Sequence, residues 1–369
     1  MASELKPEQA RIEPHFFRLR IGSRPCSFGA CCRPFRLSSF GAGAEVVPPL
    51  AFVGRHATKF MAGGVLIGFL VPPLAALAKP LLVPALVIPL ALALIRLDWS
   101  AITASRRQPG LVAALVVWIL GVSPLLVWAV TTPALALGLP AGLREALILM
   151  SASSPIVSSV AIALFVGLDA TLAVVAVVFA TALVPVTLPP VALALLDLEL
   201  TLSLPAFMGR LAAMVGGAFA AAWVVRRTVR PSTLVARRDL IDGLAVVNLV
   251  VFAIAIMDGV TAFALARPGY AALATVLAFL FNIALQAGGW LAFRHRGAAT
   301  ALTAGLVSGN CNMGLVLVAL SGHASIEVTS FFALAQLPMF MLPALLEPLY
   351  RRMLAAAGDG RSQERARSR

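Results

Sequence analysis

Apolar runs long enough to cross a bilayer recur along most of this sequence. A transmembrane helix needs about 20 consecutive, mostly apolar residues to cross about 30 Å of hydrocarbon. Of the 369 residues, 60% are hydrophobic and only 12% are charged, which leaves too few polar groups to cover a water-soluble fold. Because the runs are long and do not alternate as the strands of a membrane β-barrel do, the sequence predicts an all-α polytopic membrane protein.

The runs predict ten transmembrane helices, five in each half of the chain. They are 58–77, 79–96, 110–131, 140–167, 169–196, 205–229, 236–260, 268–294, 298–321 and 324–350. Arginines follow the second, sixth, eighth and tenth segments, whereas the intervening loops carry almost no Lys or Arg. By the positive-inside rule, this alternation predicts a multi-pass protein of the inner (plasma) membrane with both termini in the cytoplasm.

The ends of the chain differ from the middle. Residues 1–57 and 351–369 are polar and basic, and we expect disordered tails there, with Met61 as an alternative start. Between them lie two five-helix halves, 58–197 and 198–350, which cross the membrane in opposite directions because five is odd. This is the pattern of an inverted repeat. The net charge of +13 lies in tails and alternate loops, so the expected partner is the lipid bilayer and not nucleic acid.

One segment in each half contains helix-breaking residues. The fourth contains SASSPIVSSV (151–160), in which Pro155 lacks an amide hydrogen and disfavours a helical residue before it. The ninth contains SGNCNMGL (308–315), with Gly309 and Gly314 on either side of two asparagines and a cysteine. We therefore expect the fourth and ninth helices to be discontinuous and to cross each other.

A helix broken inside the membrane frees amides at one new end and carbonyls at the other, and these line ion and solute sites. The candidate substrate-binding residues are Ser158, Ser159, Asn310, Asn312, Asn282 and Gln336. Serines and glycines are also common where transmembrane helices pack closely, and amides also bond between helices. The two asparagines at 310 and 312 favour a site, because a buried amide without partners costs several kcal/mol.

The layout and both motifs resemble the bile acid:sodium symporter family. GNCNMGLV (309–316) is similar to the family's ninth-helix motif Gly-Met-Gln-Asn-Ser-Gly-Leu, and ASSPIVSSVAIALFVGLD (152–169) is similar to its fourth-helix motif. The resemblance implies a core of the third to fifth and eighth to tenth helices, with the other four forming a panel. It also implies sodium-coupled transport of organic anions by alternating access.

The sequence departs from the family at its sodium ligands. The family's ninth-helix glutamate and glutamine positions hold Val307 and Cys311, and the third segment has no glutamine. What persists of the family's ligands is Ser159, Thr181 and Asn312, a possible weak sodium site. A cation held by neutral dipoles binds less tightly than one facing a carboxylate, so we expect weak sodium dependence or none.

The expected function is secondary transport of a small organic anion, with no cofactor beyond sodium. A sodium-independent uniporter or exchanger, an effluxer similar to arsenite or auxin carriers, and, less favoured, a channel are the alternatives. An intramembrane enzyme needs titratable groups or a metal cluster in the bilayer. Every histidine falls in a tail or loop, and no carboxylate pair shares a segment face, so we expect no enzyme. The sequence leaves the oligomeric state open.

Overall fold

The computed structural model describes residues 48–97, 99–105, 108–196, 203–320 and 322–367. The secondary structure of these residues is helical. Six helices are long and apolar enough to cross a membrane. They are Pro72–Arg96, Pro109–Ala136, Ala170–Leu196, Leu204–Thr228, Pro268–Arg296 and Ile326–Ala357. A seventh is formed if α13 (Arg238–Ala255) and α14 (Val260–Ala266), which are bent by 40°, count as one span. The described chain therefore has the helices of an all-α, multi-pass membrane protein.

Three predicted segments agree with single helices to within one residue at each end. The segments 169–196, 205–229 and 268–294 correspond to α10 (Ala170–Leu196), α11 (Leu204–Thr228) and α15 (Pro268–Phe293). These segments have clear starts and ends because polar or basic residues flank an uninterrupted apolar run. Helix α10 continues through Pro185, Pro189 and Pro190, as transmembrane helices tolerate.

The boundary between the first two predicted segments is wrong. Helix α2 (Ala57–Leu70) ends at Val71, and α3 (Pro72–Ala78) then continues through η1 (Lys79–Leu81) into α4 (Leu82–Arg96). Val71 is non-helical, with φ −123° and ψ 70°. Two prolines follow it, and a residue before proline is pushed out of the helical region. The break therefore falls before the prolines rather than after residue 77.

The third and tenth predicted segments are longer than expected and internally modified. Helices α6 (Pro109–Val117) and α7 (Ser123–Ala136) are joined by η2 (Trp118–Val122), a π-helical turn just before Pro124. Proline lacks the amide that would continue the hydrogen-bond ladder, and such turns are a common adjustment. In the tenth, α18 (Ile326–Leu334) and α19 (Gln336–Arg367) meet at Ala335. The short helices are α5 (Ser100–Ser105), α12 (Pro231–Ala236) and η3 (Arg294–Arg296).

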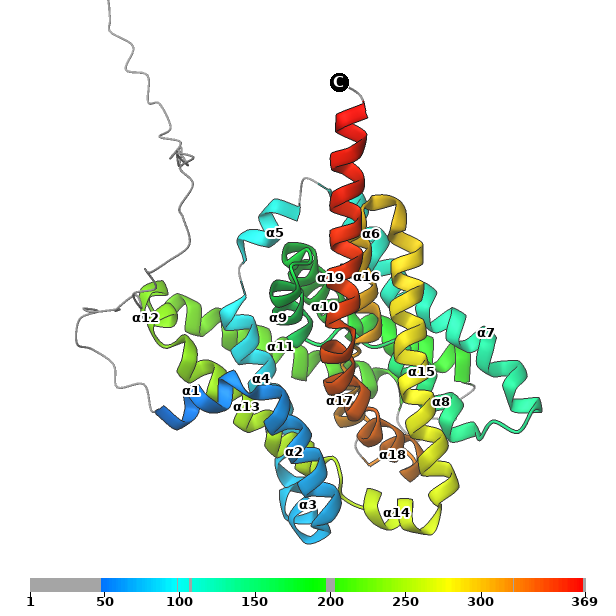
Figure 1. Cartoon of the computed structure of the whole chain (residues 1–369). Helices are drawn as coiled ribbons and strands as arrows, with labels where there is room; N and C mark the ends of the chain where they lie inside the picture. The colour runs from blue at the N-terminus through cyan, green and yellow to red at the C-terminus, as the bar shows by residue number, and fades with distance from the viewer. Residues whose placement is uncertain (1–47, 98, 106–107, 197–202, 321, 368–369) are drawn as a thin grey trace, which may run out of the picture. The chain divides into compact units, whose positions relative to one another are not determined.

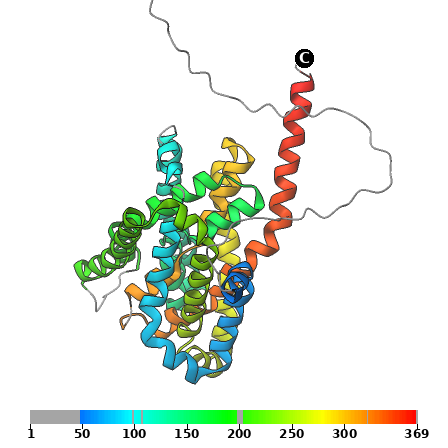
Figure 2. The same cartoon turned by 90° about the vertical axis from the view of Figure 1, so that its left-hand side faces the viewer.

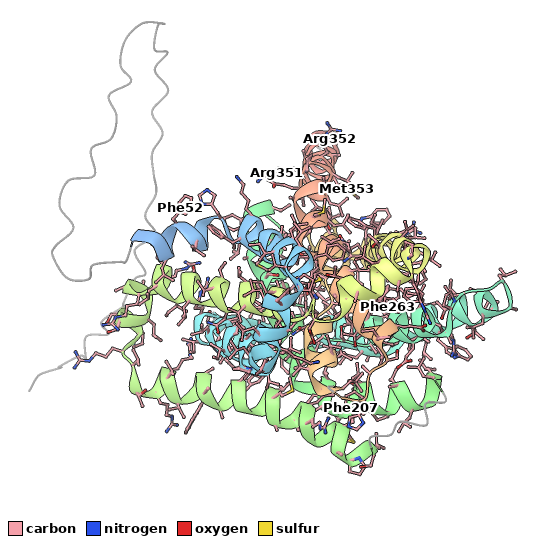
Figure 3. All side chains as sticks on the ribbon, turned by 90° about the horizontal axis from the view of Figure 1, so that it is seen from below. Phe52, Phe207, Phe263, Arg351, Arg352 and Met353 are labelled. Carbon is pink, nitrogen blue, oxygen red and sulfur yellow. The ribbon has the colours of Figure 1, made fainter. Side chains whose placement is uncertain are left out.

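Helices occupy parts of both predicted tails. Residues 1–47 lie outside the described residues, but α1 (Pro48–Arg55) is helical within the predicted 1–57 tail. At the other end, α19 runs to Arg367 through the predicted 351–369 tail. Figures 1 and 2 show it continuing past the ends of its neighbours, and Figure 3 labels Arg351, Arg352 and Met353 along it.

One group of helices packs around α13 and another around α10 and α15, and the two groups also contact each other, above all through α10 and α11. The α13 group contains α1, α2, α3, α4, α11 and α13, several of which lie side by side in Figure 1. The α15 group contains α6, α7, α8, α9, α10, α15, α16, α18 and α19. Two ion pairs lie at opposite ends of the contact between α4 and α13: Arg96 of α4 pairs with Asp242 of α13, and Lys79 of η1 pairs at 2.8 Å with Asp258, which lies between α13 and α14. Helix α17 (Met313–Ala319) contacts helices of both groups.

Helix α1 packs so closely on α13 that glycines are needed at the contact. A Cβ on Gly243 would lie 2.9 Å from the Leu50 Cβ and closer still to the Leu50 carbonyl oxygen. A Cβ on Gly54 would lie 3.3 Å from the Gly243 nitrogen. Helix α1 is therefore part of the packed α13 group.

A chain that starts at Ala57 lacks α1 but keeps α2, so we expect it to melt several degrees lower in detergent than a chain that starts at Ala44. The Gly243→Ala variant of the longer chain keeps every residue but displaces α1, and it should show the same direction of change. Equal melting temperatures for all three proteins would contradict the packing role of α1.

Candidate functional site

Two helices are interrupted at the places that the sequence predicts. Helices α8 (Ala141–Ser151) and α9 (Ser158–Val166) are separated around Pro155. Helices α16 (Ala298–Gly309) and α17 are separated by residues 310–312, where Asn310 (φ −85°, ψ 74°) and Asn312 (φ −84°, ψ 67°) leave the helical region. The interruption of both segments is confirmed.

The two interruptions meet each other. The Ile156 amide donates to the Asn310 carbonyl oxygen at 2.8 Å, and the Asn312 amide donates to the Ser154 carbonyl oxygen at 2.7 Å. Together these bonds make an antiparallel bridge between Pro155 and Cys311. Backbone groups in an apolar bundle must find partners inside the protein, and each interruption supplies them for the other.

Buried polar side chains around the interruptions keep unused hydrogen-bonding capacity. Asn310 is fully buried, and neither its Oδ1 nor its Nδ2 has a partner within the described residues. The buried hydroxyls of Ser154 and Ser159 are unpartnered in the same sense. An unsatisfied buried group costs about 1–3 kcal/mol, so several such groups together point to a ligand, an ion or water.

Two predicted residues on adjacent positions have different environments. Ser159 is completely buried at the start of α9, whereas Ser158 is exposed on the same helix. The difference follows from the helical rotation of about 100° per residue. Ser159 therefore lies inside the bundle with Asn310, and Ser158 faces its outside.

Asn312 has a structural task that the sequence analysis missed. Its Oδ1 accepts from the Leu315 amide at 3.4 Å and caps α17. Asparagine is among the best N-caps, and its place three residues before Leu315 was an available signal. The capping bond leaves the Nδ2 of Asn312 as the donor that the side chain can offer elsewhere.

Asn282 belongs to a buried polar chain. Its Oδ1 accepts from Gln286 Nε2 at 2.7 Å, and Gln286 Oε1 accepts from the Tyr350 hydroxyl. A Cβ on Gly309 would lie 2.7 Å from the Asn282 carbonyl oxygen and 2.9 Å from its Oδ1. Asn282 thus braces the interruption from α15. Sequence reasoning overlooked Tyr350, although a tyrosine in an apolar span usually needs a hydroxyl partner.

The possible sodium ligands lie on three elements. Ser159 and Thr181 have buried hydroxyls without partners in the described part of the chain, and α10, which carries Thr181, packs against α9 and α16. The capping oxygen of Asn312 retains a second lone pair. Val307 and Cys311 are buried. No group of three His, Cys, Asp or Glu side chains that could hold a metal ion occurs among the described residues.

A small pocket lies beside the interruptions, between the two helix groups. It is lined by Leu86, Ile156, Leu249, Phe252, Asn312, Met313, Gly314, Gln336, Met339 and Phe340. Its volume is about 20 Å³, about enough for one water. The lining is apolar apart from the amides of Asn312 and Gln336, so this arrangement can hold one small polar group next to an apolar surface.

No protein-family model matches the sequence, and no curated protein matches it. The resemblance to the bile acid:sodium symporter family therefore rests on the layout and the two motifs alone. The family assignment stays a prediction.

We expect Gly309→Ala to lower the melting temperature in detergent strongly, because the added methyl group collides with Asn282 and overpacking costs about 1–3 kcal/mol. The matched control is Gly217→Ala on α11, where a Cβ would meet nothing within 4 Å. That change should be neutral or slightly stabilising, since alanine favours helix. Equal melting temperatures for the two variants would contradict the close approach of α15.

Proposed function

We propose that this chain is a secondary membrane transporter that moves a small organic anion by alternating access. The observation that carries the proposal is the pairing of two interrupted helices inside an apolar bundle, with unpartnered polar groups at the same place. Paired interrupted helices near the middle of the bilayer are the usual site-forming element of secondary transporters. A pocket at the boundary of the two helix groups supplies the place where such a site opens.

In this proposal the chain crosses the membrane ten times, as two inverted five-helix repeats. The crossings are α2, α3–α4, α6–α7, α8/α9, α10, α11, α13–α14, α15, α16/α17 and α18–α19. The α15 group with α17 is the core, and the α13 group is the panel. Rocking of the panel against the core exposes the pocket to either side in turn. The protein lies in the inner membrane, and both of its termini are in the cytoplasm.

The driving force follows from the missing carboxylate. Val307 occupies the position where the resembled family has a glutamate, and neutral oxygens of Ser159, Thr181 and Asn312 remain. A desolvated cation gains much more from a carboxylate than from neutral dipoles. Sodium dependence is therefore weak or lost, and the transporter acts as a uniporter, an exchanger or a carrier with one low-affinity sodium site.

The alternatives differ in what they require. A channel needs a continuous polar path or a gated pore, whereas the pocket is small and mostly apolar, with Phe252, Met339 and Phe340 in its lining. An effluxer of another solute shares the architecture and differs only in the solute. We propose no enzymatic activity, because the described residues 151–158 and 309–313 contain no histidine or carboxylate that could act beside their serine and cysteine side chains.

Alternating access predicts that one position is reached from both sides of the membrane. In a cysteine-free background, Met339→Cys on α19 and Leu249→Cys on α13 should react with a membrane-impermeant thiol reagent in both right-side-out and inside-out vesicles. Ala222→Cys is the control, because Ala222 is fully buried in α11 and outside the pocket. Labelling from one side only, or from neither, would contradict the proposal.

Weak sodium binding predicts a small thermal response. Replacing potassium by sodium at constant ionic strength should raise the melting temperature very little, because ligand stabilisation grows as RT ln(1 + [L]/Kd). Any small rise should disappear in Thr181→Val. A large sodium-specific rise, or strong sodium-driven uphill uptake in proteoliposomes, would show that the missing carboxylate does not matter.

A further inference from the structure

We propose that the pocket binds the head group of the solute as an uncharged carboxylic acid, held by Gln336 and Asn312, so that the solute carries its own proton. This inference rests on the proposed function, which supplies the solute. It goes further, because it says that the solute is bound in its protonated form and that the ion which crosses with it is a proton.

Gln336 presents an acceptor. Its Nε2 donates to the Phe332 carbonyl oxygen at 3.2 Å. This bond identifies the nitrogen end of the side-chain amide and therefore also the oxygen end. The remaining Oε1 is buried and has no partner within the residues that the structure describes, and the side chain is 1% exposed. An amide oxygen only accepts hydrogen bonds. Because Gln336 is also one of the residues that line the pocket, we infer that this buried oxygen becomes the acceptor on the α19 side when the pocket opens.

Asn312 presents a donor. The Leu315 amide donates to the Asn312 backbone oxygen at 3.3 Å and also to its Oδ1 at 3.4 Å. Because an N–H bonds to an oxygen and not to an NH₂ group, Oδ1 is the end of the side chain that caps α17. The Nδ2 is then the end left for the pocket, which Asn312 lines together with Gln336. An amide NH₂ only donates. The pocket thus offers one donor and one acceptor.

A carboxylic acid matches this pair and a carboxylate does not. The acid's O–H donates to Gln336 Oε1, and its C=O accepts from Asn312 Nδ2. A carboxylate has acceptors only, so one of its oxygens would face the Gln336 oxygen without a proton between them. Sites built for one hydrogen-bonding pattern strongly reject a ligand that lacks it.

Charge gives the same result. All buried polar side chains in the described residues are neutral: Ser123, Thr131, Ser151, Ser153, Ser154, Ser159, Thr181, Asn282, Gln286, Thr303, Ser308, Asn310, Asn312, Ser330 and Gln336. A desolvated carboxylate without a cationic partner is very costly. Protonation of the solute removes that cost without any titrating protein group.

The charged and titratable groups of the surrounding elements lie outside the pocket. On α4 and α13 these are Arg96, Arg238, Asp239 and Asp242, with Lys79 and Asp258 at the other end. On α19 they are Glu347, Tyr350, Arg351 and Arg352, followed toward its C-terminal end by Asp359, Arg361, Glu364, Arg365 and Arg367. Helices α8, α11 and α18, which also contact α17, carry Arg144, Glu145, Arg210, Arg226, Arg227 and Glu327. Between α16 and α17 the titratable group is Cys311, whose Sγ donates to the Ser308 carbonyl oxygen. None of these residues lines the pocket.

The consequence for transport is electroneutral movement of an acid with its proton. The carboxylate takes up one proton from water on one side, crosses as the acid, and releases that proton on the other side. A pH gradient then drives accumulation, which fits the lack of a sodium carboxylate. The pocket now has room for about one water, so binding of the head group and of the apolar body both require α4 and α13 to move away from α17 and α19.

The test measures binding of benzoic acid and benzamide to the protein in lipid nanodiscs by calorimetry, in sodium-free buffer between pH 5 and 8. The apparent Kd of benzoic acid should rise about tenfold per pH unit, because the protonated fraction falls by that factor. Buffers of different ionisation enthalpy should show one proton taken up per molecule bound. Benzamide, which keeps a donor and an acceptor at every pH, should bind with a constant Kd.

Two variants test the assigned atoms. Asn312→Asp keeps the oxygen that caps α17 but replaces the donor, and Gln336→Met removes the acceptor at similar size. Each should weaken binding of both probes at least tenfold at pH 5. Asn248→Leu is the matched control, because Asn248 lies on α13 outside the pocket and donates to the Leu244 carbonyl oxygen. It should bind both probes like the unaltered protein.

Benzoate binding that is constant between pH 5 and 8, with no proton uptake, would overturn the inference in favour of a bound carboxylate. Absence of binding by both probes at every pH would overturn it as well. Two-sided labelling of the cysteine variants would still support a transporter in either case. One-sided labelling together with pH-dependent binding would instead remove the transport proposal and keep the site.

Discussion

The fold around the candidate site depends on two backbone hydrogen bonds between residues that are far apart in sequence. Ile156 donates to Asn310, and Asn312 donates to Ser154. In an apolar bundle a broken helix is tolerable only when its freed amides and carbonyls find partners. Because each interruption supplies what the other lacks, the two have to lie at the same place, and the helices that carry them are positioned by that requirement.

Because the freed backbone amides and carbonyls bond to each other, the nearby side chains can make other hydrogen bonds. Asn312 caps α17, Asn282 braces Gly309 through the Gln286–Tyr350 chain, and Asn310 keeps both ends of its amide unpaired. Helix α17 contacts helices of both groups, including α4 and α11 on one side and α8 and α18 on the other. The pocket at that place is lined by neutral side chains only, and this neutrality is the basis on which we propose a neutral head group.

Much of this was predictable from residues whose effect is local. Prolines and glycines set the interruptions in the fourth and ninth segments, and continuous apolar runs set α10, α11 and α15 almost to the residue. The boundary at Val71 was misplaced, because hydropathy does not register a proline pair in an apolar stretch. The helices α1 and α19 occupy parts of the predicted tails. The sequence could not tell that Ser159 is buried and Ser158 exposed. That difference depends on how α9 is rotated about its axis, which is set by the interruption before it.

The sequence by itself determined that the chain is a bundle of apolar helices with two breaks, because length, hydropathy and proline act within a few neighbouring residues. Only the tertiary structure decided that the breaks bond to each other, that Asn312 gives its oxygen to Leu315, and that Gln336 gives its nitrogen to Phe332. When a neighbouring backbone group bonds to one end of a side-chain amide, only the other end remains for a ligand. Whether a buried asparagine or glutamine acts as donor or acceptor is therefore fixed by packing and not by its identity.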